Sequence, residues 1–299
     1  MTEEQCCPTL KLVHKGKVRE TYQTEKENYR LMVATDRIST HNIVHQDAIP
    51  KKGEILTALT IFWSQLLHEV GISTHIVAFG QDIYKYLPVG TYPSDLHDRA
   101  IVVQYLDMIP VEFIFRNHLT GSLWNGYSKG EVNPYGIDLP ENMKMMEEFP
   151  VAVFTPTDKS ETDEPLDSMD TKALYPDAYN IASQVMLVIR GYLHECGLGL
   201  IDSKLELGYH NGHVVLGDEI VTPDSSRIVP LNSIKVGQNP TWLDKQPVRD
   251  EAERMWNGGP KIPLEFSADT INQTTSIYED VFARITGYTL EAFQNNNMR

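Results

Sequence analysis

The chain has 299 residues, of which 41% are hydrophobic and 22% charged, an ordinary composition for a globular protein that more readily forms two lobes than one. Its formal net charge is −15 and no block of basic residues offsets it, so we expect neither a nucleic acid nor an anionic membrane as a partner. Small anions stay compatible with this charge, because a few convergent Lys and Arg side chains suffice to bind them.

The three cysteines, Cys6, Cys7 and Cys196, show neither Cys-x-x-Cys spacing nor a Cys/His metal pattern. An adjacent pair does not easily form a disulfide with itself. No apolar run approaches the length of a membrane span. These features predict a soluble protein in the reducing cytoplasm.

The amino-terminal part reads as short antiparallel strands, which the apolar pattern places over 10–13, 18–23 and 30–35. The first connection, residues 14–19, puts Gly16 among three cations, and its backbone amides and side chains could cover phosphates. A solvated basic turn is the alternative that this stretch leaves open.

A helix and further strands follow. Apolar residues from Leu56 to Leu67 keep helical spacing and Gly71 ends the run, so the aromatic residues there should lie in the core. Strands are predicted over 74–79, 100–106 and 111–115, and Asp107-Met108-Ile109-Pro110 breaks the pattern between the last two. We place the boundary between two lobes at this break, giving residues 1–108 and 109–299.

The second half begins with a polar stretch and then becomes helical. Residues 154–170 are rich in Thr, Asp, Glu and Pro and predict an irregular, exposed loop, a type of segment that often acts as a lid. The most periodic helix runs from Tyr179 to Cys196 and is closed by Gly197. Helical runs over 248–256 and 271–286 predict packing elements.

The most informative stretch is a charged hairpin over residues 201–228. Asn211-Gly212 joins two alternating apolar runs, and this dipeptide readily takes the positive φ angles of a tight antiparallel turn. Lys204 and Glu206 are two residues apart and so share one face of the first strand.

Acidic residues end the second strand of this hairpin, where Asp218 and Glu219 point to opposite faces. Carboxylates from paired strands can converge on Mg²⁺, which is generally held by one or two protein carboxylates together with substrate phosphates. A strand with one solvated face is the alternative. The polar and cationic loop from Asp224 to Arg227 suits an anion and favours the functional interpretation.

The strand register decides whether the two carboxylates can share a metal ion. With a two-residue loop, Glu206 would face Gly217 and Asp218 would point to the other side of the sheet; adding His213 to the loop would pair Glu206 with Asp218. We therefore predict a three-residue loop or a bulge between Gly208 and Gly217.

Together these motifs closely resemble one family. The motifs are Gly16-Lys17-Val18-Arg19, Ala34-Thr35-Asp36-Arg37-Ile38-Ser39, Arg116-Asn117, Thr120-Gly121-Ser122, Lys204-Leu205-Glu206 and the stretch from Gly217 to Arg227. In this order, and over nearly the whole chain, they are similar to the phosphoribosylaminoimidazole-succinocarboxamide synthase (SAICAR synthase) family. The resemblance implies an α+β, two-lobed ATP-binding fold related to ATP-grasp enzymes and protein kinases. It also implies ATP-dependent ligation of L-aspartate to 5-aminoimidazole-4-carboxylate ribotide (CAIR) through an acyl phosphate, a step of de novo purine biosynthesis.

The resemblance further assigns roles to individual residues. They are Gly16, Lys17, Arg19, Gln104, Leu106 and Met108 for ATP, Glu206 and Asp218 for Mg²⁺, Lys204 and Asp218 for catalysis, and Arg116, Ser122, Asp224 and Arg227 for CAIR. Residues 1–108 would then be the nucleotide-binding lobe, and 109–299 the lobe with the CAIR and magnesium sites. Two alternatives would use the same residues, a small-molecule kinase and a nucleotide-binding regulator that has lost catalysis.

Overall fold

The chain folds into two compact units of mixed helices and antiparallel sheets in the computed structural model, which describes residues 5–160 and 162–299. One unit takes in residues up to 66, 75–105 and 244–299, and the other takes in 67–74 and 106–243. The predicted α+β class is confirmed. These units are not the predicted lobes residue for residue, because residues 67–74 and 106–108 group with the second unit and residues 244–299 group with the first. The assignment of a nucleotide-binding lobe and a CAIR-binding lobe stays a prediction.

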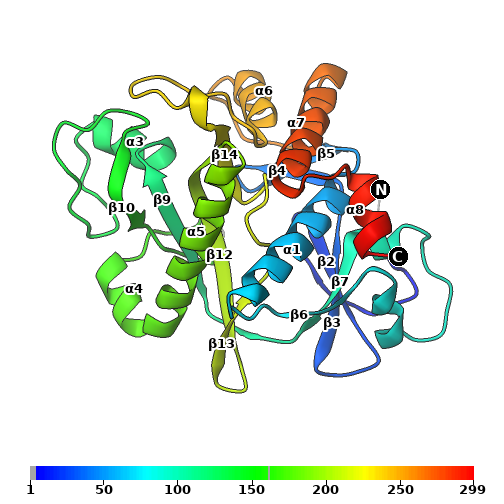
Figure 1. The fold of residues 1–299 in the computed structure, drawn as a ribbon. Helices are drawn as coiled ribbons and strands as arrows, with labels where there is room; N and C mark the ends of the chain where they lie inside the picture. The colour runs from blue at the N-terminus through cyan, green and yellow to red at the C-terminus, as the bar shows by residue number, and fades with distance from the viewer. Residues whose placement is uncertain (1–4, 161) are drawn as a thin grey trace. The chain divides into compact units, whose positions relative to one another are not determined.

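The first unit contains a five-stranded antiparallel sheet in the order β1-β2-β3-β7-β6 (Figure 1). Its strands are β1 (Leu12–Lys15), β2 (Arg19–Gln23), β3 (Tyr29–Ala34), β6 (Ile76–Phe79) and β7 (Ala100–Gln104). Tyr22, Leu31 and Val102 lie in its core. The predicted antiparallel opening of three strands is confirmed, and each strand end lies within two residues of its predicted place.

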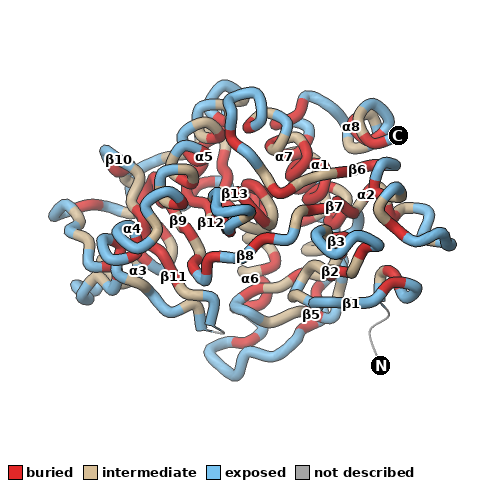
Figure 2. The backbone as a smooth tube through the Cα atoms, turned by 90° about the horizontal axis from the view of Figure 1, so that it is seen from below, coloured by how far each residue is buried: buried red, intermediate tan, exposed pale blue. Residues whose placement is uncertain are grey.

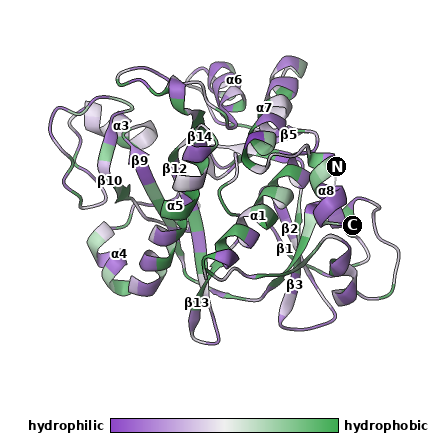
Figure 3. Ribbon diagram, viewed as in Figure 1, coloured by the Kyte–Doolittle hydropathy of each residue, from purple (hydrophilic) through white to green (hydrophobic). Residues whose placement is uncertain are grey.

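A hairpin and several helices complete the first unit. They are β4 (Arg37–Thr40), β5 (Ile43–Ala48), α1 (Lys52–Glu69), the 3₁₀ helix η1 (Gly80–Tyr86), α2 (Leu96–Arg99), α6 (Gln246–Trp256), α7 (Ala268–Thr286) and α8 (Leu290–Asn297). Helix α1 is largely hydrophobic (Figure 3), and its Trp63 is fully buried as predicted. Ile38 and Ile49 share a core with Val248 and Trp256 of α6, which explains why the carboxyl-terminal segment belongs to this unit.

The second unit is built on a seven-stranded antiparallel sheet with β12 at its centre. The main path is β10-β9-β12-β13, while β11 also pairs with β9, and β8 and β14 also pair with β12. The strands are β8 (Asp107–Met108), β9 (Val111–His118), β10 (Glu148–Phe154), β11 (Thr157–Asp158), β12 (Leu198–His210), β13 (His213–Gly217) and β14 (Ser226–Pro230). Buried residues follow one another along β9 and β12 (Figure 2).

The helical elements of the second unit are α3 (Gly121–Ser128), α4 (Ser168–Leu174), α5 (Pro176–Glu195) and the 3₁₀ helix η2 (Leu231–Ser233). Helix α5 packs on β12, β13 and β9 (Figure 1). The ring of Tyr179 lies 5.7 Å from that of Phe115 and 5.2 Å from that of Phe154, measured between centroids. One face of the sheet is therefore apolar. Within the described part of the chain, no helix has both the length and the apolar character needed to cross a membrane.

Candidate active site

The candidate site lies on the other face of this sheet. Asp202, Lys204 and Glu206 occupy every second position of β12, so their side chains leave the strand on the same side. The antiparallel register puts Arg116 of β9 opposite Asp202 and brings Glu112 of the same strand beside Glu206. This register produces two clusters of charged residues, one around Asp202 and one around Lys204 and Glu206.

The first, the lysine–carboxylate cluster, comprises Glu112, Lys159, Lys204, Glu206 and Asp218. The Lys204 ammonium lies 2.6 Å from Oε1 of Glu112 and 3.2 Å from Oε1 of Glu206. Lys159 donates to the other carboxylate oxygen of Glu206. Burial by itself would lower the pKa of Lys204, but the charges of the three carboxylates outweigh it and raise that pKa above its usual value. Lys204 is therefore held as a cation.

Glu112 is a member of this cluster that the sequence reasoning missed. Its Oε2 accepts a hydrogen bond of 3.0 Å from Oγ1 of Thr157, the residue paired with it on β11. Only 14% of the Glu112 side chain is exposed, so both of its oxygens are held in place. Glu112 lies four residues before Arg116 in one strand and hence on the same face, a spacing from which it could have been found.

The hairpin turn differs from the prediction. Asn211 and Gly212 have φ angles of 51° and 79° and form a two-residue turn, and Glu206 pairs with Gly217. The predicted three-residue loop or bulge is wrong, because Asn-Gly accommodates both left-handed conformations that the shortest hairpin requires.

The chain leaves the regular strand pattern one residue after β13 instead. Asp218 has a φ of 52°, in the left-handed region that a short polar side chain tolerates better than most. The strand alternation of side chains, which would have directed Asp218 to the far face of the sheet, stops at this residue. The charge of Asp218 contributes to the raised pKa of Lys204. The sharing of a metal ion by Glu206 and Asp218 stays a prediction.

The second, the arginine–aspartate cluster, comprises Arg116, Asp202 and Arg227 on three neighbouring strands. Asp202 pairs with Arg116 of β9 on one side and with Arg227 of β14 on the other. Its Oδ2 accepts from Nη1 of Arg116 at 3.3 Å and from Nη1 of Arg227 at 2.8 Å. Nε of Arg116 also donates to Oγ1 of Thr155 at 2.9 Å. The exposed fraction of the Arg116 side chain is 8%, so it is a buried partner rather than a surface ion pair.

The other predicted CAIR residues lie around Arg227. Gly121 has a φ of 60°, and a Cβ on it would come within 2.4 Å of Nη1 of Arg227, so only glycine lets α3 begin against this guanidinium. Ser122 follows in the first turn of that helix. Asp224 lies in the turn before β14, where its amide donates to Oγ1 of Thr222 at 3.2 Å. The structure thus brings Arg116, Ser122 and Arg227 together.

The residues predicted to bind ATP are divided between the units. Gly16, Lys17, Arg19 and Gln104 belong to the first, and Leu106 and Met108 belong to the second. In the turn between β1 and β2, the amide of Gly16 donates to the carbonyl of Arg19 at 2.8 Å, so this donor is used within the turn. Nζ of Lys17 donates to Oδ1 of Asn42 at 2.5 Å.

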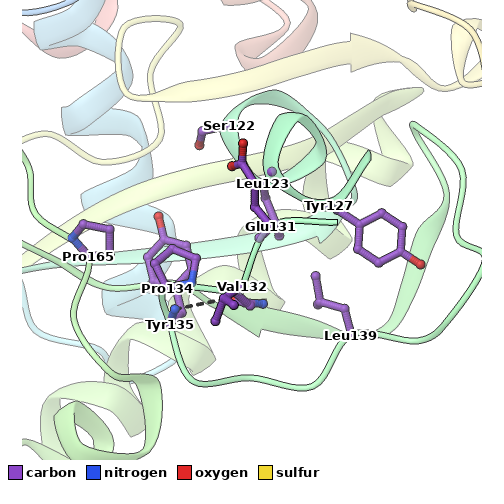
Figure 4. A pocket seen from close by; sticks show the side chains of 11 residues that line it. Ser122, Leu123, Tyr127, Glu131, Val132, Pro134, Tyr135, Leu139 and Pro165 are labelled. Atoms are coloured by element: carbon purple, nitrogen blue, oxygen red, sulfur yellow. Dashed lines mark hydrogen bonds between the residues drawn. The ribbon is translucent and has the colours of Figure 1, made fainter. Parts of the chain in front are cut away.

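A cavity of about 360 Å³ lies beside α3 in the second unit (Figure 4). Its lining is mainly apolar and includes Leu123, Tyr127, Pro134 and Leu139. Ser122 is the one residue of the predicted site that lines it. The charged clusters therefore lie outside this cavity.

The residues present fit a magnesium ion. Among the described residues, no three acidic, histidine or cysteine side chains converge so as to hold a metal by themselves. Mg²⁺ commonly takes only one or two protein carboxylates and completes its shell with water and substrate phosphates. Glu206 and Asp218 supply oxygen ligands of this kind, and both act on the same ammonium group.

Comparison with known proteins identifies the family. A sequence model of the SAICAR synthetase family matches residues 12–263. The chain belongs to this family. The phosphoribosylaminoimidazole-succinocarboxamide synthase of Thermodesulfovibrio yellowstonii is 33% identical, covering 93% of this chain and 96% of its own length. That of Stenotrophomonas maltophilia is 34% identical, covering 95% and 97%.

Solved structures agree with this assignment. The SAICAR synthase of Saccharomyces cerevisiae, in complex with SAICAR, superposes with a TM-score of 0.85 at 32% identity, covering 96% of this chain and 98% of that one. As a SAICAR synthetase, the chain is a ligase of purine biosynthesis, which confirms the function expected from the sequence. These relatives favour neither the kinase nor the silent regulator.

Proposed function

We propose that this protein uses ATP to join the amine of L-aspartate to the carboxylate of CAIR, and that it releases SAICAR, ADP and phosphate. The observation that carries the proposal is the polar face of β9, β12 and β14, on which a cluster with excess positive charge and a cluster with excess negative charge share one strand. A carboxylate does not react with an amine directly, because its leaving group would be oxide. Its phosphorylation by ATP gives an acyl phosphate, from which phosphate departs.

The arginine–aspartate cluster is the proposed site for the ribotide phosphate, with Ser122 and Asp224 at its edge. Each guanidinium has five N–H donors, and Asp202 occupies only Nη1 of each. Among the described residues, Nη2 of neither Arg116 nor Arg227 has a hydrogen-bond partner. Two nearby guanidinium groups with donors to spare suit bidentate contacts to a phosphate.

Lys204 is the proposed contact for the reacting groups. It lies two residues from Asp202 along β12, about 6 to 7 Å at the usual rise per residue, a span that a ribotide bound at the arginines can bridge to its own carboxylate. The ammonium would stabilise charge on that carboxylate and on the phosphoryl group it receives. When bound by Glu206 and Asp218, Mg²⁺ would neutralise further charge on the transferring phosphoryl group.

The nucleotide contacts complete the proposal. Gly16, Lys17 and Arg19 are proposed to cover the phosphates of ATP, since two of them are cations and the glycine keeps the turn small. Gln104, Leu106 and Met108 are proposed to contact the adenine base.

Measurement of ADP release with each substrate omitted in turn tests the proposal. ADP should form at a substantial rate only when CAIR and L-aspartate are both present, because the amine is needed to consume the activated carboxylate. Steady ADP release with CAIR but without aspartate would instead support a kinase. ADP release that requires neither would contradict ligation at this site.

A further inference from the structure

Arg37 binds the backbone of the turn between β1 and β2. Its Nε donates to the carbonyl of Lys17 at 3.0 Å, and its Nη2 donates to the carbonyl of Gly16 at 3.1 Å. One planar guanidinium thus holds two consecutive peptide groups in a fixed orientation. The exposed fraction of the Arg37 side chain is 16%, so the guanidinium itself is largely shielded from water.

This contact determines where the next two amides point. Every peptide bond in the described chain is trans, and in a trans peptide the C=O and the following N–H point in opposite directions. With both carbonyls directed at Arg37, the N–H groups of Lys17 and Val18 are directed away from it. Neither amide donates to any residue that the structure describes. Two adjacent N–H groups of this kind form a concave anion site.

The Arg37 side chain is itself held by a buried carboxylate. Nη1 donates to Oε1 of Glu20 at 2.8 Å, and the Glu20 side chain is 0% exposed. The other oxygen, Oε2, accepts from the amide of Cys6 at 2.9 Å and from the hydroxyl of Tyr22. Arg37 thus donates three hydrogen bonds, one to Glu20 and two to the carbonyls of the turn. They leave its side chain little freedom to rotate, so the turn that it binds is preorganised.

We propose that Arg37 is a positioning residue for ATP, which turns the amides of Lys17 and Val18 toward the nucleotide phosphates without touching the nucleotide. This inference rests on the proposed function, in which the turn formed by residues 16–19 binds those phosphates. It adds two backbone donors and the residue that orients them.

The substitution Arg37→Lys tests the inference, because lysine keeps the charge but cannot donate to two carbonyls and a carboxylate in one plane. The dissociation constant for ATP, measured by calorimetry on the full chain, should rise about tenfold or more. The KM for CAIR and the melting temperature should change no more than in the control. An unchanged ATP affinity in Arg37→Lys would overturn the inference.

Arg249→Lys is the matched control. Nη1 of Arg249 donates at 2.8 Å to Asp244, a carboxylate whose side chain is 0% exposed, so this variant also removes a guanidinium from a buried acid of the same unit. It should bind ATP like the unaltered protein. Equal weakening in both variants would show that Arg37 acts only through stability, and would overturn the inference.

Hydrogen–deuterium exchange supplies a second test that needs no variant. Saturating ATP should slow exchange of the amides of Lys17 and Val18, and unchanged exchange there would overturn the inference while leaving ATP binding intact. Failure of the unaltered protein to bind ATP at all would overturn the proposed function as well, which separates the two outcomes.

Discussion

The two charged clusters on β12 have net charges of opposite sign. In the arginine–aspartate cluster, one carboxylate is shared by two guanidinium groups, which leaves one positive charge in excess. In the lysine–carboxylate cluster, Lys204 and Lys159 face Glu112, Glu206 and Asp218, which leaves one negative charge in excess. The same strand therefore offers a site for an anion next to a site for a cation.

The difference shows how a sheet separates two kinds of chemistry over a few residues. Each buried charge is paired, so neither cluster leaves an isolated ion in the protein. The excess charge is what remains for a ligand, and it has opposite sign at Asp202 and at Lys204. A phosphate and a divalent cation would each bind at one end of the row, and substitutions that change the charge balance of one cluster should leave the other unaltered.

The largest expected effect comes from removing the cation at the centre of the lysine–carboxylate cluster. Lys204→Met should lower kcat for ADP release by at least about 100-fold, the range for loss of a group that stabilises transition-state charge. The dissociation constant for CAIR should change far less. Lys129→Met, which removes an exposed lysine paired with Glu131 in the same unit, is the control. Retention of more than a tenth of the activity in Lys204→Met would remove Lys204 from the mechanism.

The next effect concerns the carboxylate shared by the two arginines. Asp202→Asn should lower the free energy of unfolding by about 3 kcal/mol, because the buried guanidinium of Arg116 and the partly buried one of Arg227 lose their counter-charge. Urea denaturation measures this loss, with the exposed Asp138→Asn as control. Inorganic phosphate should restore more stability to Asp202→Asn than to the unaltered protein, since it binds only the folded state. Equal stabilisation of both by phosphate would contradict an anion site at this cluster.

A smaller effect is expected from removing one of the arginines. Arg227→Ala should weaken CAIR binding by about 1.5 to 3 kcal/mol, the range for hydrogen bonds to charged groups, and should leave ATP binding nearly unchanged. Titration calorimetry with each ligand separates the two affinities. Arg190→Ala, which removes a half-exposed arginine paired with Glu148, should alter neither. If CAIR and ATP affinities fall together in Arg227→Ala, the two clusters are not independent.

The smallest effect concerns Glu112 and appears in the pH profile. The neighbouring carboxylates raise the folded-state pKa of Lys204 above the ~10.4 of an unfolded lysine. The ion pairs of Lys204 therefore stabilise the fold fully below about pH 10.4, and this stability is lost as the pH rises from there through the folded-state pKa. Glu112→Gln removes one of these charges and should lower the folded-state pKa of Lys204, so less stability should be lost as the pH rises above ~10.4. At neutral pH kcat should fall by only about three- to tenfold.

Urea denaturation at neutral and at alkaline pH checks this change in stability. Glu131→Gln, at an exposed glutamate paired with Lys129, should leave the profile unchanged. An alkaline loss of stability in Glu112→Gln equal to that of the unaltered protein would mean that Glu112 does not act on Lys204.

Much of the fold could be predicted because it depends on local patterns. Periodicity predicted α1 and α5 and the first three strands, since apolar side chains must repeat with the period of the element that buries them. The carboxyl-terminal segment could not be assigned in this way. Its helix α6 shares a core with Ile38 and Ile49, which lie some two hundred residues earlier in the chain, and no local sequence pattern predicts such a contact.

The hairpin shows the same division within a few residues. Asn211-Gly212 determined the turn by itself, because a two-residue connection needs positive φ at both positions and this dipeptide adopts it readily. The angle of Asp218 could not be inferred, since nothing in its neighbours requires the strand to end at Gly217.

By itself, the sequence determined the residue types of the site, the period-two spacing that puts Lys204 beside Glu206, and the family to which these motifs belong. Only the tertiary structure decided which strands lie next to β12, and with them that Asp202 joins Arg116 to Arg227 and that Glu112 holds Lys204. The physical reason is that spacing along one strand is fixed by covalent geometry. Pairing between distant strands depends instead on the burial and the hydrogen bonding of all the strands of the sheet together.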